Sequence, residues 1–574
     1  MSQKTGAQII WECLLKEQVE TVFGYPGGAI LPAYDALTQY RIRHVLVRHE
    51  QGAAHMADGY ARASGKVGVA LATSGPGATN LVTGIATAMM DSSPVVCITG
   101  QVPGPVIGRD AFQECDVTGI TLPITKHNYL VTRAQHIAPT IKEAFHLARS
   151  GRPGPVLVDI TKDAQQESAD FDWDDIEVRL PGARPASGVL PDELQQAVEL
   201  INAAQKPLIL AGQGVIQSGS TEGLLQFVDK TSIPVSCTLL GLGGFPASHP
   251  LNLGMMGMHG ESWVNHAIQQ ADLLLAFGMR FDDRVTGNPA TYATAAKKIH
   301  VDIDRAEINK NVQVDLGIVG DLRDTLLQLN EAVDECSHRQ WNADIEEMKG
   351  DSAVRDIQTL PDNGRLYAAH VINDIWNLTD GKAMVVTDVG QHQMWEAQYY
   401  KHEFPRQLIT SGGLGTMGFA LPAAIGARMA CPEGEIWVVC GDGGFQMTAC
   451  ELSTCAQEEL DINVAIINNG YLGMVRQWQE FFYEKRYSAT PLRNPDFCLL
   501  AQAHGLQTLQ ARTRSQARES IAKARRTQGT VVVDFRVEQE DSVYPMVPAG
   551  NCLHDMIRRP LEENPLVETA QSRW

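Results

Sequence analysis

Short apolar runs rich in β-branched residues alternate with helical patterns along most of the chain. In the first third the runs are HVLVRH, VGVALAT, PVVCIT and GPVLVDI, and the middle third has PLILAG, PVSCTL, LLLAFG and KIHVDID. The last third adds MVVTD, EIWVVCG, NVAIINN and VVVDFRV. Near-continuous apolar strands separated by helices are typical of parallel sheets covered on both faces. The pattern therefore predicts an α/β protein of three doubly wound domains with mainly parallel sheets.

Two stretches without strand character interrupt this alternation. The first, 165–190, is acidic and then rich in Pro, Gly, Ala and Ser, and the second, 337–365, mixes charges with LPDNG. We therefore expect linkers there, and domains over 1–180, 190–340 and 365–548, followed by a C-terminal tail over 549–574. The last residues of that tail, LEENPLVETAQSRW, fit either a flexible tail or a lid near a site. Whether the three units descend from one another is left open by one sequence.

The N-terminal segment has the features of a helix. Thr5 and Gln8 have capping-box spacing, and they precede the apolar residues Ile9, Ile10, Leu14 and Leu15. The segment lacks a signal-peptide core, and no run approaches the roughly 18 apolar residues of a membrane span. The eleven cysteines include no C-x-x-C pair and fit small buried residues in a reducing cytoplasm. We expect a soluble cytoplasmic protein.

Composition narrows the class of partner. The 574 residues leave room for three or four domains, and 44% hydrophobic with 20% charged residues is ordinary globular composition. Lys and Arg number 47 against 67 Asp and Glu, which gives a net charge of −20. This balance argues against a nucleic-acid groove or an anionic membrane as the main partner.

The strongest chemical signal is a pair of polar turns that follow two apolar strands. Gly441-Asp442-Gly443 follows IWVVC, and Asn469-Gly470-Tyr471 comes after the next helix and the strand NVAII. Adjacent parallel strands would bring the Asp442 carboxylate and the Asn469 amide oxygen to one sheet edge. Magnesium needs few protein ligands when phosphate oxygens and water complete its octahedron. Each turn alone could be a simple strand-helix connection. Together they resemble the diphosphate-binding motif of thiamine-diphosphate enzymes.

Thiamine chemistry also needs an acid in an apolar pocket that shares a proton with the aminopyrimidine ring of the cofactor. Glu50 follows the strand HVLV and precedes the small-residue helix start QGAAHMA. An acid at a helix N-terminus can also be there only for the helix dipole. Because Glu50 and Asp442 lie in different predicted domains, a shared site must form at an interface between a pyrimidine-binding and a diphosphate-binding unit.

Many further segments, in order, resemble one family. They include FGYPGGAILPAYDAL, SGPGATNLVTGIATA, GRDAFQECD, SGRPGPVLVDI, GMMGMHG, FDDRVTGN, TDVGQHQMW, SGGLGTMGFALPAAIGA and GYLGMVRQWQ. The chain resembles the bacterial catalytic large subunits of the acetohydroxyacid synthase (acetolactate synthase) family from residue 5 to about 550. The resemblance implies three domains that bind the thiamine pyrimidine, FAD, and thiamine diphosphate with Mg²⁺. It also implies a homodimer or homotetramer with the site between subunits, and leaves a small regulatory subunit open.

The resemblance also implies roles for individual residues. Glu50 is the expected cofactor-activating acid, Asp442, Asn469 and the Tyr471 carbonyl are the expected metal ligands, and Gln391 and His392 contact the diphosphate. Met417 in GTMG is the expected wedge that bends the cofactor, although an ordinary core methionine is the alternative. The remaining thiamine-site residues implied are Gly415, Gly441, Gly443, Gly444, Met474 and Val475. Gly444 departs from the family, where serine or alanine is commoner.

FAD binding rests on the resemblance, because the GxGxxG fingerprint is absent. The residues implied are Arg152, His259, Gly278, Arg280, Asp302 and Asp321. A flavin is unexpected in this family, because the net reaction that the family catalyses has no redox step.

The implied reaction decarboxylates pyruvate on thiamine diphosphate and transfers the hydroxyethyl unit to a second 2-keto acid. Pyruvate as acceptor gives 2-acetolactate and 2-ketobutyrate gives 2-aceto-2-hydroxybutyrate, the first common step of branched-chain amino-acid biosynthesis. Arg284 would bind the acceptor carboxylate, with an ion pair to Asp282 or Asp283 as the alternative. Trp478 would select 2-ketobutyrate, with a core role as the alternative. The remaining site wall implied is Gly28, Phe112, Gln113 and Lys162, with ordinary packing as the alternative for Phe112, Met474 and Val475.

Two other interpretations compete with this one. The first is a related thiamine-diphosphate enzyme, namely a 2-ketoacid decarboxylase, a pyruvate oxidase or glyoxylate carboligase. Arg284 and Trp478 argue against a simple decarboxylase, and Glu50 argues against glyoxylate carboligase, whose family lacks an acid there. The second is a non-catalytic nucleotide-binding or regulatory subunit, against which the joint presence of Glu50, Asp442 and Asn469 argues.

Overall fold

The computed structural model describes residues 2–178, 180, 188–353, 355–358 and 363–560. Three six-stranded sheets organise these residues, and every strand pair within them is parallel. The described residues form two compact units. Unit 1 takes residues from 1–187, 366–396 and 402–540, and unit 2 from 188–365, 397–401 and 541–574. The predicted α/β class with three mainly parallel sheets is confirmed.

The N-terminal sheet of unit 1 has the strand order β3-β2-β4-β5-β7-β6. Its strands are β2 (Thr21–Gly24), β3 (Arg43–Leu46), β4 (Gly68–Ala72), β5 (Val95–Gln101), β6 (His127–Val131) and β7 (Val156–Thr161). Its helices are α1 (Gly6–Lys16), α2 (Leu31–Leu37), α3 (Glu50–Ser64), α4 (Pro76–Asn80), α5 (Val82–Met90), α6 (Val117–Thr121), α7 (Ile137–Arg149) and α8 (Lys162–Gln166). A separate antiparallel pair joins β1 (Ser2–Thr5) to β8 (Ser168–Phe171).

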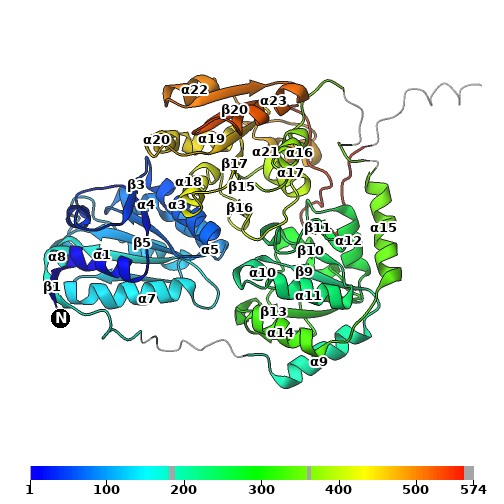
Figure 1. Cartoon of the computed structure of the whole chain (residues 1–574), viewed down its shortest axis with the longest axis horizontal. Coiled ribbons are helices and arrows are strands. Elements are labelled where there is room, and N and C mark those ends of the chain that lie inside the picture. Colours follow the sequence, from blue (N-terminus) through cyan, green and yellow to red (C-terminus); the bar gives the residue numbers. More distant parts are fainter. Residues whose placement is uncertain (1, 179, 181–187, 354, 359–362, 561–574) are drawn as a thin grey trace, which may run out of the picture. The chain divides into compact units, whose positions relative to one another are not determined.

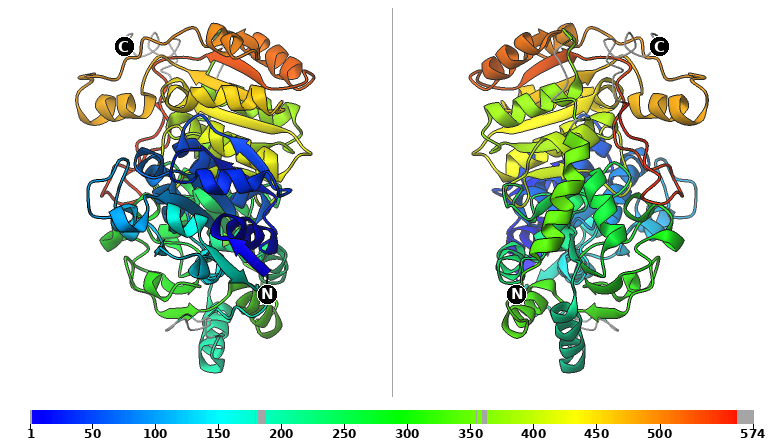
Figure 2. Two further views of the ribbon diagram at one scale, coloured as in Figure 1. Left: turned by 90° about the vertical axis from the view of Figure 1, so that its left-hand side faces the viewer. Right: turned by 90° about the vertical axis from the view of Figure 1, so that its right-hand side faces the viewer.

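The C-terminal sheet of unit 1 has the order β16-β15-β17-β18-β20-β19, which is the same order when strands are counted within each sheet. Its strands are β15 (Met384–Thr387), β16 (Leu408–Thr410), β17 (Ile436–Gly441), β18 (Asn463–Asn468), β19 (Gln507–Ala511) and β20 (Val531–Arg536). Helices lie on both faces of it, as Figure 2 shows. They are α16 (Ala368–Leu378), α17 (Gln391–Tyr399), α18 (Ala420–Ala430), α19 (Asp442–Thr448), α20 (Leu452–Gln457), α21 (Gly473–Phe482), α22 (Phe497–Ala503) and α23 (Arg514–Ala524).

The sheet of unit 2 has a different order, β11-β10-β9-β12-β13-β14. Counted along the chain this is 3-2-1-4-5-6, the order of dinucleotide-binding folds. Its strands are β9 (Pro207–Ala211), β10 (Val235–Cys237), β11 (Asn252–Met255), β12 (Leu273–Phe277), β13 (Lys297–Asp302) and β14 (Leu316–Val319). Its helices are α9 (Pro191–Ala203), α10 (Gln213–Gln217), α11 (Thr221–Thr231), α12 (Ser262–Gln270), α13 (Asp283–Thr286), α14 (Leu322–Ala332) and α15 (Arg339–Ala353).

The two sheets of unit 1 are joined by α3 and α18, which pack side by side (Figure 1). Two glycines permit the close approach. A Cβ at Gly59 of α3 would lie 2.0 Å from the carbonyl oxygen of Ala423, and one at Gly426 of α18 would lie 1.8 Å from that of Met56. One apolar core, with Phe23 from the first sheet and Val438 from the third, spans both helices. Unit 1 is therefore a single packed body with two parallel sheets.

The N-terminal helix forms as its sequence predicts. Thr5 caps α1, with the reciprocal bond from Gln8 that completes a capping box. Ile9, Ile10 and Leu14 are buried, whereas Leu15 is 42% exposed and lies off the buried face.

The two expected linkers carry regular structure. Helix α15 occupies much of 337–365, and its Trp341 is buried and donates to the Pro207 carbonyl at 3.0 Å. Strand β8 lies within 165–190. The pairing of β8 with β1 contradicts the expected lack of strand character in the first segment, whereas α15 is compatible with the expectation for the second. The domain boundaries themselves stay predictions, and residues 561–574 of the expected tail lie outside the described residues. In the part of the chain described here, no helix has the length and apolarity that a membrane crossing requires.

Candidate active site

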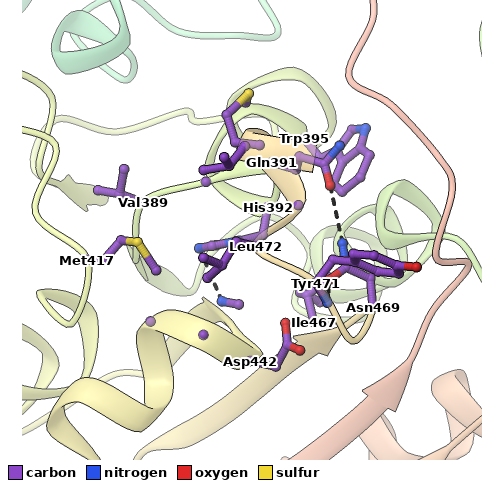
Figure 3. Close-up of a pocket in the computed structure, with 17 residues that line it drawn as sticks. Val389, Gln391, His392, Trp395, Met417, Asp442, Ile467, Asn469, Tyr471 and Leu472 are labelled. Atoms are coloured by element: carbon purple, nitrogen blue, oxygen red, sulfur yellow. Dashed lines mark hydrogen bonds between the residues drawn. The ribbon is translucent and has the colours of Figure 1, made fainter. Parts of the chain in front are cut away.

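A pocket opens at the carboxyl edge of the C-terminal sheet, where the loops after β15, β17 and β18 meet (Figure 3). Its lining comes from 389–392 after β15, 441–444 at the end of β17 and beyond, and 467, 469 and 471–475 at the end of β18 and beyond, with Met417 and Trp395. The strand order reverses between β15 and β17. Ligands of open parallel sheets bind at such switch points, beyond the carboxyl ends of the strands.

Asp442 is the buried carboxylate of this pocket. It is the first residue of α19 and is 1% exposed. Its Oδ2 accepts hydrogen bonds from the Gly470 N–H at 3.1 Å and from Asn494 Nδ2 at 2.6 Å. Burial raises the pKa of Asp442 to about 6, against the opposing effect of the Asn494 hydrogen bond. A buried carboxylate that two hydrogen bonds hold in one orientation is well suited to bind a cation.

Asn469 meets Asp442 at the same sheet edge, because β17 and β18 are adjacent and parallel. The expectation from the two polar turns is thereby confirmed. Asn469 Oδ1 accepts from the Tyr471 N–H at 3.0 Å, and its Nδ2 donates to Gln391 Oε1 at 3.2 Å. Gln391 in turn donates to Gln477 Oε1 at 2.9 Å. This buried chain of amides orients the oxygen of Asn469.

His392 is held between two glycines. The Gly441 N–H donates to His392 Nε2 at 3.2 Å, and a Cβ at either Gly390 or Gly441 would lie 2.9 Å from the ring Cε1. Burial lowers the pKa of His392 to about 3, so the ring is neutral. Because Nε2 accepts, the proton of the neutral ring lies on Nδ1. The ring therefore has a fixed orientation in the wall of the pocket.

Met417 lines the pocket and is only half-buried, so it is not an ordinary core methionine. Gly443 leaves room beside it, since a Cβ there would lie 2.7 Å from Leu472 Cδ2 and 3.5 Å from Met417 Cε. Gly444 is required by a different neighbour, because its Cβ would lie 2.4 Å from Asp388 Oδ2. Gly415 has a φ of +71° in the loop before Met417 and is not a lining residue.

The predicted residues of the N-terminal sheet lie outside this pocket. Glu50 begins α3, is half-buried and accepts from Asn80 Nδ2 at 2.9 Å. Phe112 is 88% exposed, so a packing role within this chain is excluded. Gly28 is exposed, while Gln113 and Lys162 are half-buried. The described structure of one chain thus brings together the predicted metal and diphosphate residues but not the predicted acid.

Three predicted residues of α21 divide in the same way. Met474 and Val475 line the pocket, whereas Trp478 does not. Trp478 is half-buried and makes an edge contact with Phe482, with ring centres 5.3 Å apart. It is therefore not a fully buried core tryptophan.

Most of the predicted FAD residues belong to unit 2, and Arg152 belongs to unit 1. Gly278, Asp302 and Asp321 follow or end β12, β13 and β14 at one sheet edge. The order reverses between β9 and β12, and there Gly278 packs directly on Gly214, since a Cβ on it would lie 2.6 Å from the Gly214 Cα. His259 is buried and its Nδ1 lies 3.2 Å from the Pro545 carbonyl. Arg152 donates to Ser92 Oγ at 2.7 Å, and Arg280 lies 3.7 Å from Asp282.

Arg284, the predicted acceptor-binding residue, also lies in unit 2. Its guanidinium lies 3.2 Å from the Asp283 carboxylate, and both side chains are largely exposed. Exposed pairs of this kind contribute at most about 1 kcal/mol. The ion pair expected as an alternative is present, and it leaves the guanidinium accessible to another carboxylate.

Comparison with known protein families gives three matches, one in the region of each parallel sheet. The N-terminal domain of thiamine pyrophosphate enzymes matches residues 4–120, the central domain matches 194–329 and the C-terminal thiamine-pyrophosphate-binding domain matches 388–535. The acetolactate synthase large subunit of Corynebacterium glutamicum is 49% identical over 566 residues, which span 96% of this chain and 90% of that protein. A probable acetolactate synthase large subunit of Methanocaldococcus jannaschii is 44% identical over 99% of this chain and 97% of that protein. The chain belongs to the acetolactate synthase family of thiamine pyrophosphate enzymes.

The pocket fits the thiamine diphosphate and magnesium that this family membership implies. Asp442 and Asn469 line it with two hard oxygens, and the glycines at 441 and 443 make room for His392 and Leu472, which also line it. Among the described residues there is no cluster of three or more His, Cys, Asp or Glu side chains that could hold a metal ion. A site with one carboxylate suits Mg²⁺, because phosphate oxygens and water fill its remaining positions.

In this member of the acetolactate synthase family, three hydrogen-bonding residues around the site were not predicted from the sequence. Asn494 donates to both Asp442 Oδ2 and Asn468 Oδ1, Gln477 supports Gln391, and Asp388 accepts from the Gly418 N–H at 2.8 Å. Asp388 follows directly on β15 in TDVGQHQ, so its place at a strand end was a usable signal. Asn494 lies in a loop between α21 and α22 and has no such signal.

Proposed function

We propose that the chain catalyses the acetolactate synthase reaction, in which pyruvate loses CO₂ and its two-carbon unit is joined to a second 2-keto acid. Pyruvate as acceptor gives 2-acetolactate, and 2-ketobutyrate gives 2-aceto-2-hydroxybutyrate. The observation that carries this proposal is the meeting of Asp442 and Asn469 at one sheet edge, in a chain that matches acetolactate synthases over nearly its whole length. A related decarboxylase or oxidase is the weaker alternative.

The C-terminal pocket would hold the diphosphate end of the cofactor. Asp442, Asn469 and the Tyr471 carbonyl would bind Mg²⁺, and the neutral His392 with Gln391 would face the diphosphate. Met417 would hold the cofactor from below as an apolar wedge that takes no proton. When bound, thiamine diphosphate stabilises the negative charge left by loss of CO₂.

Glu50 of one chain would exchange a proton with the aminopyrimidine ring of a cofactor that is bound to a second copy of the chain. Two observations support this arrangement: Glu50 is absent from the pocket of its own chain, and the nearby Phe112 is 88% exposed. A large exposed aromatic side chain is a common feature of a subunit interface. The proposed assembly is a homodimer or homotetramer, and the designation of relatives as large subunits supports a separate small subunit.

Selection of the acceptor would use Arg284 and Trp478. The Arg284 guanidinium would bind the acceptor carboxylate with two parallel hydrogen bonds. Trp478 would contact the alkyl group, and Gly28, Phe112, Gln113 and Lys162 would complete the wall. All of these roles remain proposals.

FAD would bind at the switch point of the unit 2 sheet. The close contact of Gly278 with Gly214 leaves backbone rather than side chains at that edge, which lets a dinucleotide approach closely. Asp302, Asp321, His259 and Arg280 would surround it, and Arg152 is a further residue that the family resemblance adds to the proposed set.

All eleven cysteines lie within the described residues and are free thiols, which supports the proposed cytoplasmic location.

The test is incubation of the purified protein with pyruvate and 2-ketobutyrate together, with thiamine diphosphate, Mg²⁺ and FAD each omitted in turn. We expect both acetohydroxy acids, and loss of product without thiamine diphosphate or Mg²⁺. Formation of acetaldehyde or acetyl phosphate alone by the wild-type protein would contradict the proposal and favour the decarboxylase or oxidase.

A further inference from the structure

The loop 411–418 contains Met417, which lines the pocket. Side chains of the N-terminal domain contact this loop. It connects β16 to α18, and Gly415 and Gly418 both have positive φ angles, of +71° and +86°. Such a loop has few contacts of its own that could fix its shape, so its position must come from its neighbours.

Asp91 makes the central contact with this loop. It ends α5 in the N-terminal domain and is 1% exposed. Its Oδ1 accepts from the Gly413 N–H at 2.6 Å, and its Oδ2 accepts from the Gly412 N–H at 3.2 Å. Both bonds join a buried carboxylate to backbone groups, and such charge-assisted bonds are among the stronger ones in proteins.

Arg62 on α3 holds Asp91 in place and also contacts the two residues that flank the loop, Thr410 and Phe419. Its guanidinium donates to Asp91 Oδ2 at 2.8 Å and to the Thr410 carbonyl at 2.6 Å. It also makes two bonds to Asp58, one turn earlier on α3, at 2.7 and 2.9 Å. The guanidinium lies over the ring of Phe419, the residue that follows the loop.

The charges of Asp58, Arg62 and Asp91 explain why this buried cluster depends on the loop. Two carboxylates share one guanidinium, so one negative charge is in excess. The Gly413 N–H stabilises Asp91 Oδ1, the oxygen that does not bond to Arg62, and the Gly412 N–H shares Oδ2 with the guanidinium. If the loop moved away, a buried carboxylate would lose two hydrogen bonds, which is costly.

A second, uncharged contact fixes the loop next to Met417. Thr87 on α5 is buried, and its Oγ1 lies 2.7 Å from Thr416 Oγ1. The Thr416 N–H also donates to Ser411 Oγ at 3.0 Å, which closes the loop on itself.

We infer that Asp91 is a positioning residue for cofactor binding: fixed by Arg62, it holds the loop 411–418 so that Met417 faces the thiamine diphosphate. The N-terminal domain thus shapes the diphosphate pocket of its own chain through α3 and α5. This inference rests on the assignment of thiamine diphosphate to the pocket.

The chain offers a matched control in Asp58. Both carboxylates are buried and pair with Arg62, but of these two only Asp91 bonds to the loop. Asp91→Asn and Asp58→Asn each remove one carboxylate charge from the cluster and keep side-chain size. A purely structural cluster predicts the same effect from both, whereas a positioning role predicts different effects.

The experiment is calorimetric titration of thiamine diphosphate, with Mg²⁺ present, into the full-length wild-type, D91N and D58N proteins after removal of bound cofactor. We expect D91N to weaken thiamine diphosphate binding about tenfold or more and D58N to leave it within about twofold. Equal weakening in both variants, or unchanged binding in D91N, would overturn the inference. If the wild-type protein itself fails to bind thiamine diphosphate, the cofactor assignment is what fails.

A milder variant keeps the test decisive if D91N does not fold. Thr87→Val keeps the side-chain shape and removes only the hydroxyl, which contacts Thr416 and also donates to the Thr83 carbonyl of its own helix at 2.8 Å. We expect T87V to weaken thiamine diphosphate binding about threefold or more, in line with loss of the neutral hydrogen bond to Thr416. Binding equal to that of the wild-type protein would overturn the inference.

Discussion

The two sheets of unit 1 share one strand order, yet their carboxyl edges differ. At the edge of the C-terminal sheet, Asp442, Asn469 and His392 are buried and bonded to one another's loops. At the corresponding edge of the N-terminal sheet, Gly28 and Phe112 are exposed and Glu50 is half-buried. The same topology thus gives one edge that its own chain completes and one that it leaves open. An open edge with an exposed aromatic side chain is what a second copy of the chain would cover.

The largest expected effect comes from changing the acid of the open edge. Glu50→Gln keeps the size of the side chain and removes the carboxyl proton, so it tests acid-base chemistry alone. We expect kcat to fall about 10²-fold to 10⁴-fold while thiamine diphosphate binding changes little. The measurements are steady-state acetolactate formation at saturating cofactor and calorimetric cofactor binding.

Glu20→Gln, a change of the same type on the exposed surface of the same domain, should leave kcat unchanged. Unaltered turnover in E50Q would mean that the open edge carries no catalytic acid, and the comparison of the two edges would lose its functional meaning.

The next effect concerns the closed edge, where Asn494 orients Asp442. Asn494→Ala removes the 2.6 Å bond to Asp442 Oδ2 and leaves the carboxylate itself in place. Loss of a group that orients a metal ligand typically weakens metal binding about 10-fold to 100-fold. We expect the Mg²⁺ concentration for half-maximal thiamine diphosphate binding to rise by that factor, with kcat at saturating Mg²⁺ nearly retained.

The exposed Asn377 on α16 provides a control, since Asn377→Ala removes the same group from a residue that does not line the pocket. If N494A and N377A need the same Mg²⁺ concentration as the wild-type protein, the closed edge does not depend on this contact.

Much of the fold could be predicted from the sequence, and the strands that escaped are mostly edge strands. Central strands such as β17 and β18 are fully apolar runs, and they were identified. The strands β6 and β19 lie at sheet edges and are largely exposed, so their sequences carry little apolar signal. The strand β2 also escaped although it is internal and buried, and its length does not explain this, because the identified strands β3 and β15 have four residues as well.

The candidate site shows the same division between local and distant information. Asp442 and Asn469 could be placed together because adjacent parallel strands bring their ends to one edge. Asn494 reaches Asp442 from a loop whose path the sequence pattern does not give. Asp91 and Arg62 lie far from the loop 411–418 in the sequence, and only the packing of α3 against α18 joins them.

A smaller effect is expected at Trp478, which lies on α21 beside the closed edge but outside its pocket. Trp478→Leu should reduce the preference for 2-ketobutyrate over pyruvate about tenfold, because contact with one methylene contributes about 1 kcal/mol or more. Acetolactate formation should persist. The measurement is the ratio of the two products in a competition assay.

Trp376→Leu, at a half-buried tryptophan of α16, is the control for loss of an indole ring. A product ratio in W478L equal to that of the wild-type protein would assign Trp478 to packing against Phe482 alone.

The smallest expected effect compares buried aspartates of the two sheets by their pH dependence. Burial raises the pKa of Asp388 in the C-terminal domain to about 7, and burial raises that of Asp159 in the N-terminal sheet to about 6, both from 3.8. The folded state keeps each proton at pH values where the unfolded chain has lost it. Each group therefore contributes stability that is complete below about pH 4 and is lost as the pH rises through its folded pKa.

Replacing either residue by Asn removes this dependence, because the amide does not titrate. We expect the thermal midpoint of Asp388→Asn to gain on the wild-type midpoint as the pH rises through about 7, and that of Asp159→Asn to do so near pH 6. The slope removed is at most about 1.4 kcal/mol per pH unit. The measurement is thermal unfolding from about pH 5 to 8, with the exposed Asp192→Asn as the control. If all four midpoints change in parallel, neither aspartate holds its proton, and the two domains do not differ in this respect.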